Sequence, residues 1–253
     1  MQKRPLGRTG IEVSALCLGS MTWGSQNTPS EGHAQIDRAL ERGVNFIDTA
    51  EMYPTTPISA ETTGRTEEII GDWIKASGRR ADVILATKHS GKGFKHARDG
   101  APITAGSIPQ AIEGSLRRLK TDHIDLYQFH WPNRGSYMFR QNWAFDPSSQ
   151  NRDETIAHME ETLEALQREV ARGTIRAFGL SNESAWGMAQ WLRLAEAGHG
   201  PRAASLQNEY SLMWRLYDTD LAELSVNEDV GLLAFSPLAA GLLSGKYQNG
   251  ALP

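Results

Sequence analysis

The nine residues from 45 to 53, Asn-Phe-Ile-Asp-Thr-Ala-Glu-Met-Tyr, combine a short apolar run with two side chains that can exchange protons. Asp48 lies where a buried strand would end, and Tyr53 follows five residues later, within reach of a loop that folds back over that end. A carboxylate beside a phenol suggests acid–base chemistry, because a charged neighbour can shift the phenol pKa of about 10. The segment by itself leaves open a helix-capping Asp48 and a surface Tyr53.

Polar residues also end other apolar runs. Lys88 ends the run 83–88, and His130 ends the run 124–130. If these runs are parallel strands, their carboxyl ends share one face of the fold, which is where barrel enzymes build their sites. One such residue is usually a cap or a turn former, but several together favour a functional face. Polar residues follow three later strand ends in the same way: Ser181-Asn182, Gln207-Asn208 and Ser236.

The residue types predict how these side chains act together. An ammonium buried among strands needs a counter-charge, and Asp48 can supply it to Lys88. Lys88 held near Tyr53 would favour the phenolate and lower its pKa, so that Tyr53 could donate a proton near neutral pH. His130 could donate a hydrogen bond to a substrate carbonyl. The set lacks an electron source, so a hydride donor is needed.

The chain alternates between short apolar runs and segments with helical spacing. Residues 3–13 predict a small β-hairpin that would act as a lid or plug, and Ser30 is expected to cap the first helix. The long polar segment 131–151 is rich in aromatic residues and predicts a loop that covers the substrate. Seven strands are expected at 14–19, 45–48, 83–88, 124–130, 175–180, 204–207 and 230–235, with helices between them near 30–44, 65–74, 108–119, 156–173, 184–197 and 217–228.

Such alternation predicts a parallel sheet covered by helices, either an open doubly wound sheet or a closed (β/α)8 TIM barrel. An open dinucleotide-binding sheet normally carries G-x-G-x-x-G, and the nearest match, Gly91-Lys92-Gly93, lacks the third glycine. We therefore predict an α/β barrel over 1–253, as a single domain with an N-terminal hairpin. Its eighth strand is missing from these residues, so we expect them to be a portion of a polypeptide of roughly 320–350 residues.

Composition excludes several classes of function. The formal net charge is -4 with dispersed basic residues, which argues against a nucleic-acid partner. The absence of a signal peptide or a bilayer-spanning run predicts a cytoplasmic protein with no membrane partner. Cys17, the single cysteine, is expected to be a small buried hydrophobe. Scattered histidines argue against a metal site, and no G-x-S-x-G elbow is present.

Together these segments resemble the aldo-keto reductase family. The resemblance is carried by residues 45–53, by Lys88 ending Ile-Leu-Ala-Thr-Lys, by His130, and by the segments 175–182 and 234–247. Within the family it is greatest to the Tas-like bacterial members, which share Ala50-Glu-Met-Tyr-Pro54 followed by Glu61-Thr62. The resemblance covers essentially the whole chain. It implies a (β/α)8 barrel and an NADP(H)-dependent reductase of a small carbonyl substrate.

The resemblance also assigns roles to individual residues. It makes Tyr53 the proton donor, with Asp48, Lys88 and His130 as its partners, and it places the ring of Phe235 on the nicotinamide. The Gly-rich segment 240–247, otherwise a plain turn, would wrap the pyrophosphate. In the family, the segment that binds the adenosine phosphate corresponds to positions beyond residue 253, so NADP is implied only by analogy with the family. The remaining implied cofactor contacts are Gly19, Ser20, Met21, Asp48, Ser181, Asn182, Gln207, Ser236, Pro237, Leu238, Gly241, Leu243, Gly245 and Lys246.

Two other functions remain open. A cofactor-binding regulatory subunit like the potassium-channel β subunits is one, since those proteins resemble this family. His130 favours the enzyme, because the resemblance implies that the channel subunits lack histidine at this position. The other is a barrel lyase or isomerase that uses no nicotinamide cofactor. Titration of such a protein with NADPH would show no fluorescence quenching. The sequence predicts no particular oligomeric state.

Overall fold

The computed structural model describes residues 1–250. The predicted single domain also includes residues 251–253, which lie outside the described residues. None of the helices within 1–250 combines the length and the apolar composition that crossing a bilayer requires.

The sheet contains seven strands in chain order, and every neighbouring pair is parallel. Its strands bury apolar side chains on both faces, as expected for a parallel sheet covered by helices. All seven predicted strands are therefore confirmed. Their bounds are β3 Cys17–Gly19, β4 Phe46–Asp48, β5 Ile84–His89, β6 Ile124–Phe129, β7 Ile175–Ser181, β8 Ala203–Glu209 and β9 Gly231–Phe235.

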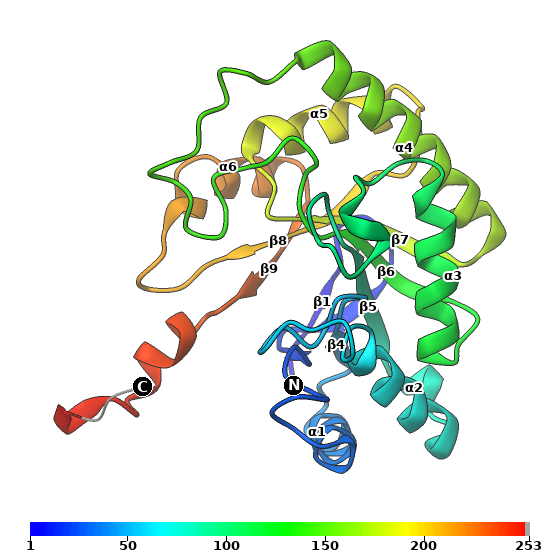
Figure 1. The fold of residues 1–253 in the computed structure, drawn as a ribbon, viewed down its shortest axis with the longest axis vertical. Helices are drawn as coiled ribbons and strands as arrows, with labels where there is room; N and C mark the ends of the chain where they lie inside the picture. Colours follow the sequence, from blue (N-terminus) through cyan, green and yellow to red (C-terminus); the bar gives the residue numbers. More distant parts are fainter. Residues whose placement is uncertain (251–253) are drawn as a thin grey trace.

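Helices follow one another around the outside of the curled sheet (Figure 1). Their apolar sides and the outward side chains of the strands form the larger of the two main core clusters. The α-helices are α1 Pro29–Glu41, α2 Arg65–Ser77, α3 Ser107–Leu119, α4 Arg152–Arg172, α5 Ala185–Glu196 and α6 Leu221–Asn227. Short 3₁₀ turns are η1 Arg80–Asp82, η2 Arg98–Gly100, η3 Leu216–Asp218, η4 Ala239–Ser244 and η5 Gln248–Gly250.

The arrangement is a curled, barrel-like α/β fold. Within residues 1–250, strand β3 pairs only with β4, and β9 pairs only with β8, so both edges of the sheet are unpaired there. The closed eight-stranded barrel remains a prediction.

The N-terminal hairpin is confirmed as a plug. Strands β1 Lys3–Pro5 and β2 Glu12–Ser14 pair antiparallel, and Leu6, Ile11 and Val13 pack against inward-facing strand residues in a second core cluster. Gly7 lies so close to β8 that a Cβ atom would come within 2.5 Å of the Ala204 carbonyl oxygen. The hairpin therefore packs against the inner face of the sheet and excludes water from it.

Two expectations were wrong. Thr28, not Ser30, caps α1: its Oγ1 accepts from the Glu31 backbone N–H at 3.3 Å, while the Glu31 carboxylate accepts from the Thr28 N–H at 2.8 Å. Pro29 suits the first helical position that follows. Cys17 is exposed rather than buried, because β3 is an edge strand within the described residues.

Candidate active site

The buried ammonium of Lys88 is hydrogen-bonded to two other predicted site residues, Asp48 and Tyr53. Its Nζ donates to Asp48 Oδ2 at 2.6 Å, to the Thr49 carbonyl at 2.8 Å and to Tyr53 Oη at 3.3 Å. The Lys88 side chain is 0% exposed, so all three of its donors must find partners inside the protein. β4 and β5 are neighbours in parallel register, which brings the two strand ends together.

Asp48 is held by two glutamine side chains in addition to Lys88. Its Oδ1 accepts from Gln207 Nε2 at 2.9 Å and from Gln128 Nε2 at 3.3 Å. Gln207 was predicted in this region, whereas Gln128 was missed. The sequence indicates the face but not the contact, because Gln128 lies two residues before His130, and side chains two apart on a strand point to the same side.

His130 lies next to Tyr53. Its ring is edge-on to Tyr53, with ring centroids 5.8 Å apart, and its Nδ1 is buried without a hydrogen-bond partner among the described residues. Burial, reinforced by the charge of Lys88, lowers the pKa of His130 well below the ordinary value. The imidazole is therefore neutral at pH 7, carries one N–H, and can donate one hydrogen bond to a ligand.

The pKa of Tyr53 corrects one expectation. Lys88 does act to lower the pKa of the phenol, but burial raises it by more, and Asp48 also raises it, so the net pKa lies above the ordinary value. Desolvation outweighs the ion because the phenol is almost completely removed from water. Tyr53 therefore stays protonated at neutral pH, which is the state a proton donor requires.

The loop between β4 and α2 fixes the Tyr53 backbone. The Tyr53 N–H donates to the Ala50 carbonyl at 3.0 Å, and its carbonyl accepts from the N–H groups of Gly64 and Thr66. Its ring belongs to a small buried apolar cluster with Ala50, Met52 and Phe94. The other reading of this segment, a surface Tyr53 and a helix-capping Asp48, is wrong, since both side chains are buried beside Lys88.

Three further predicted residues collect beside Asp48 and could hold an amide-bearing ligand. Ser181 Oγ donates to the Gln207 carbonyl at 2.8 Å, and Asn182 Nδ2 donates to the His130 carbonyl at 2.9 Å. Asn182 Oδ1 is buried without a partner among the described residues, an arrangement that costs free energy unless a ligand donor reaches it. A carboxamide NH₂, such as that of nicotinamide, fits this acceptor.

The end of the first sheet strand also reaches the site. Gly19 is in register with Asp48, and Ser20 Oγ donates to the Asp48 carbonyl at 2.7 Å. The Met21 side chain is exposed next to them. The structure therefore brings these three predicted residues to the strand end that carries Asp48.

The last predicted segment lies elsewhere. The half-buried Phe235 ends β9, and the chain after it projects from the edge of the sheet, away from β4 and β5 (Figure 1). Lys246 is exposed and packs its stem against Gly241, where a Cβ would lie 2.6 Å from Lys246 Cε. In residues 1–250 no hydrogen bond joins Asp48, Tyr53, Lys88 or His130 to the other members, Ser236, Pro237, Leu238, Gly241, Leu243, Gly245 and Lys246.

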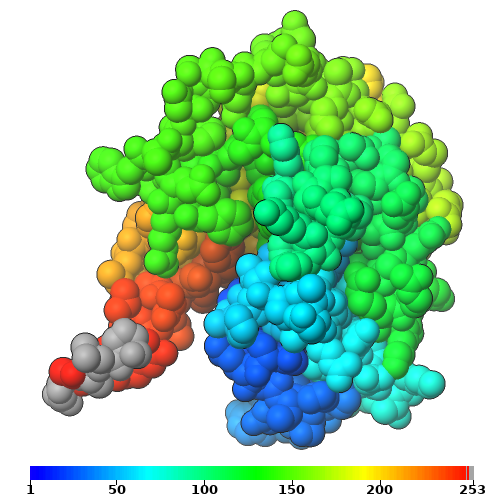
Figure 2. Space-filling view, viewed as in Figure 1, coloured from blue at the N-terminus to red at the C-terminus, as the bar shows by residue number. Residues whose placement is uncertain are grey.

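The loop 131–151 overhangs the carboxyl ends of the strands, and Figure 2 shows a hollow beneath its green surface. Trp131 lies with its ring 5.0 Å from that of His130. Two contacts that the sequence did not indicate tie the loop to the segment directly after β7: Ser136 Oγ donates to the Asn182 carbonyl at 2.8 Å, and Arg134 forms a buried ion pair with Glu183. Its role as a substrate cover stays a prediction.

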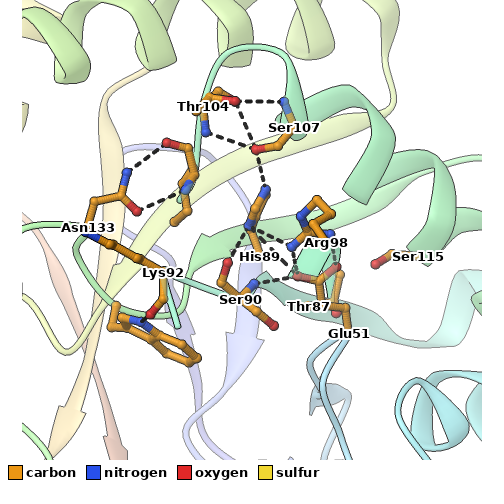
Figure 3. Close-up of polar contacts among 12 residues, drawn as sticks. Glu51, Thr87, His89, Ser90, Lys92, Arg98, Thr104, Ser107, Ser115 and Asn133 are labelled. Carbon is orange, nitrogen blue, oxygen red and sulfur yellow. Dashed lines mark hydrogen bonds and ion pairs between the residues drawn. The ribbon is translucent and has the colours of Figure 1, made fainter. Parts of the chain in front are cut away.

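His89, directly after Lys88, is fully buried behind the site (Figure 3). Its Nδ1 lies 2.7 Å from the Ser90 carbonyl oxygen and its Nε2 lies 2.9 Å from Ser107 Oγ. Burial lowers the pKa of His89 to about 4, so the ring is neutral at pH 7. The neutral imidazole satisfies both contacts by donating from Nδ1 and accepting at Nε2.

This neutral ring makes the free energy of unfolding depend on pH. An unfolded histidine binds a proton below about pH 6.5, whereas His89 binds one only near pH 4. Stability should therefore fall as pH drops through this window, by roughly 3 kcal/mol in total. Urea unfolding at pH 7 and pH 4.5 should show less pH dependence in His89→Gln than in the wild type or in His123→Gln, a partly exposed control. Equal dependence in all three proteins would show that His89 does not contribute.

Comparison with known proteins places the chain in a family. The aldo/keto reductase family signature matches residues 15–253. The chain is 41% identical to the protein tas of Escherichia coli over 257 aligned positions, covering 100% of this chain and 72% of that protein. It is 34% identical to the uncharacterized oxidoreductase YrpG of Bacillus subtilis, covering 97% and 69% of the two chains. A probable voltage-gated potassium channel subunit beta of Arabidopsis thaliana is 32% identical, covering 100% and 69%.

The chain belongs to the aldo/keto reductase family, which confirms the resemblance drawn from its motifs. The family match and the names of similar bacterial proteins support an oxidoreductase. Members of this family generally use nicotinamide cofactors.

Proposed function

We propose that the protein is an NADP(H)-dependent oxidoreductase that reduces aldehydes or ketones to alcohols. The observation that carries the proposal is the Lys88 ammonium, hydrogen-bonded to both Asp48 and Tyr53 at the carboxyl ends of adjacent parallel strands. This arrangement keeps a protonated phenol beside a fixed positive charge, which suits the delivery of a proton to a developing alkoxide.

The side chains divide the work as follows. Tyr53 Oη donates its proton to the carbonyl oxygen of the substrate, and Lys88 stabilises the phenolate that is left. Asp48 holds Lys88 in place. His130 offers an N–H to the same carbonyl oxygen and orients it. When bound, NADPH supplies the hydride that adds to the carbonyl carbon, so that hydride and proton together give the alcohol.

The cofactor contacts are proposed from the resemblance and from the unsatisfied acceptor described above. Ser181, Asn182 and Gln207 would hold the carboxamide, since Asn182 Oδ1 has no donor among residues 1–250. Phe235 would stack on the nicotinamide. The preference for NADP over NAD rests on the family likeness. The pyrophosphate contacts are assigned to the segment that follows Phe235: Ser236, Pro237, Leu238, Gly241, Leu243, Gly245 and Lys246.

The test is an assay of NADPH oxidation with a panel of aliphatic and aromatic aldehydes and ketones, with a parallel series using NADH. Turnover of at least one carbonyl compound supports the proposal. Binding of NADPH without turnover of any of them, in a protein that is folded, would overturn it.

Phe235 allows the cofactor assignment to be tested separately. Stacking needs a flat ring, so Phe235→Ala should weaken NADPH binding more than Phe235→Tyr. Because offset-stacked aromatic pairs contribute about 0.5–1.5 kcal/mol, the dissociation constant should rise only about 2- to 13-fold. Fluorescence titration of NADPH measures this, and equal affinities of the two variants would place the ring in the core instead.

A regulatory subunit is the second candidate. It is favoured by the 32% identity to a probable voltage-gated potassium channel subunit beta, which extends over the whole chain. Under this proposal the protein binds NADPH and a partner protein, and its regulatory role does not require it to turn over a substrate. The carbonyl panel separates the candidates, since a turnover that is lost in Tyr53→Phe indicates a working enzyme.

A further inference from the structure

We infer that the buried ion pair between Glu51 and Arg98 positions Tyr53 against Lys88. This inference rests on the proposed reductase function and extends it to residues outside the four catalytic candidates. The sequence assigned neither residue a role, although Glu51 lies in the segment 45–53, and neither contacts Tyr53 Oη or Lys88 Nζ through a hydrogen bond among residues 1–250. Both are therefore positioning residues.

The Glu51 carboxylate is fully partnered, as Figure 3 shows. Its Oε1 accepts from the Ser90 backbone N–H at 2.6 Å, and its Oε2 accepts from Arg98 Nη1 at 2.9 Å. A second bond from Arg98 Nη2 to Oε1 makes the pair bidentate. Glu51 is only 4% exposed, and such forked pairs fix direction as well as charge.

The pair connects the two chain segments whose relative position sets the Tyr53–Lys88 contact. Glu51 lies two residues before Tyr53 in the loop after β4, and Ser90 lies two residues after Lys88 at the end of β5. The Glu51 backbone N–H also donates to the Lys88 carbonyl at 3.3 Å. Movement of the Glu51 carboxylate would therefore displace the phenol relative to the ammonium.

Arg98 comes from a separate segment whose backbone is held under strain. Its φ is +49°, followed by +53° at Asp99 and +78° at Gly100, a left-handed conformation that non-glycine residues rarely adopt. Such conformations persist only where the surroundings over-determine them, frequently at functional sites. The same segment places Phe94 in the apolar cluster with Tyr53. The segment therefore packs against the Tyr53 ring through Phe94 and holds Glu51 through the Arg98 guanidinium.

Charge supports the same conclusion. Burial would raise the pKa of Glu51, but the hydrogen bonds and charge of Arg98, the neighbouring His89 and the Ser90 backbone N–H together outweigh it, and the net pKa lies below the ordinary value. Glu51 is thus ionised and satisfied without help from Lys88. Without Arg98, the buried Glu51 carboxylate would need another cation or water molecules as partners. Its position would change, and the Tyr53–Lys88 contact would become less fixed.

The test compares Arg98→Gln with a matched buried pair at the opposite end of the strands. We expect Arg98→Gln and Glu51→Gln each to lower kcat at least about 10-fold, since a displacement of 1 Å can cost about 100-fold. The KM for NADPH should change less than about twofold, because the residues that would hold the cofactor are untouched. The control is Arg80→Gln, which removes one of the two arginines, Arg80 and Arg176, that pair with the buried Asp125, and it should keep the wild-type kcat.

Two further variants separate positioning from folding. Arg98→Lys keeps the charge but not the fork, so it should fold and recover only part of the kcat. The double variant Glu51→Gln/Arg98→Gln should be no slower than either single variant, since both act through one contact. Wild-type kcat in folded Arg98→Lys and Glu51→Gln would overturn the inference, as would independent, additive losses.

A readout without turnover distinguishes failure of this inference from failure of the proposed function. The chain has six tyrosines, so labelling with [¹³Cζ]tyrosine gives few signals, and the Tyr53 signal is the one lost in Tyr53→Phe. At pH 7 the chemical shift of Tyr53 in Arg98→Gln should differ from the wild-type value, whereas in Arg80→Gln it should equal the wild-type value. If the wild type turns over no carbonyl compound, the proposed function fails, and an unmoved Tyr53 signal in Arg98→Gln then overturns the inference by itself.

Discussion

Replacing Tyr53 with phenylalanine should lower turnover at least about 100-fold while leaving NADPH binding close to that of the wild type. The substitution removes the proton that we propose is delivered to the substrate, together with the 3.3 Å contact to Lys88. It leaves the ring in its apolar cluster with Met52 and Phe94, so the fold should persist. Steady-state kcat and NADPH fluorescence titration measure the two effects.

Tyr127 offers a matched control for this experiment. It is a buried tyrosine in β6 whose hydroxyl has no hydrogen-bond partner among residues 1–250, and it belongs to the core cluster outside the sheet. Tyr127→Phe should therefore keep wild-type turnover. If Tyr53→Phe also turns over within a few-fold of the wild type, the assignment of Tyr53 as proton donor is wrong.

Replacing Lys88 with methionine should have the second largest effect, on turnover and on stability together. Lys88 is the group that lowers the pKa of Tyr53, so its removal should raise that pKa further and change the pH–rate profile for reduction. Asp48 would keep a buried charge without its cation, and breaking a buried pair costs about 3–5 kcal/mol. Asp48→Asn should destabilise the protein for the same reason.

The pH range of this stabilisation follows from the pKa of Lys88. Burial is the largest single influence and acts to lower that pKa, but the charge and hydrogen bond of Asp48 together with the contact to Tyr53 outweigh it, and the net pKa lies above the ordinary value. The stabilisation is therefore complete below about pH 10.4, the value for an unfolded lysine, and is lost above it as pH rises through the folded pKa. Urea unfolding at pH 7 should consequently show the whole loss in Lys88→Met.

Arg118→Met is the control for the Lys88 experiment. Arg118 donates to the buried Glu67 at 2.7 Å behind the sheet, so its loss should lower stability without changing the pH–rate profile. An unchanged profile with unchanged turnover in Lys88→Met would show that Lys88 has only a structural role.

The sequence by itself determined the order of the strands and helices and the face on which the site lies. Each strand is a short apolar run, and Asp48, Lys88 and His130 each follow or end one, so a parallel arrangement places them on one face without any knowledge of packing. The hairpin was also predicted from residues 3–13, as a lid or plug. These features depend on local patterns of polarity and turn residues, which a single sequence records directly.

Only the tertiary structure decided which side chains meet and what their surroundings do. Asp48 collects Gln128 and Gln207, which are 80 and 159 residues away in the chain, and Glu51 meets Arg98 through a strained loop. The pKa of Tyr53 rises rather than falls, because the balance between burial and the nearby ammonium depends on distances that spacing along the chain does not contain. Long-range contacts and desolvation arise only when the sheet curls, and so no motif encodes them.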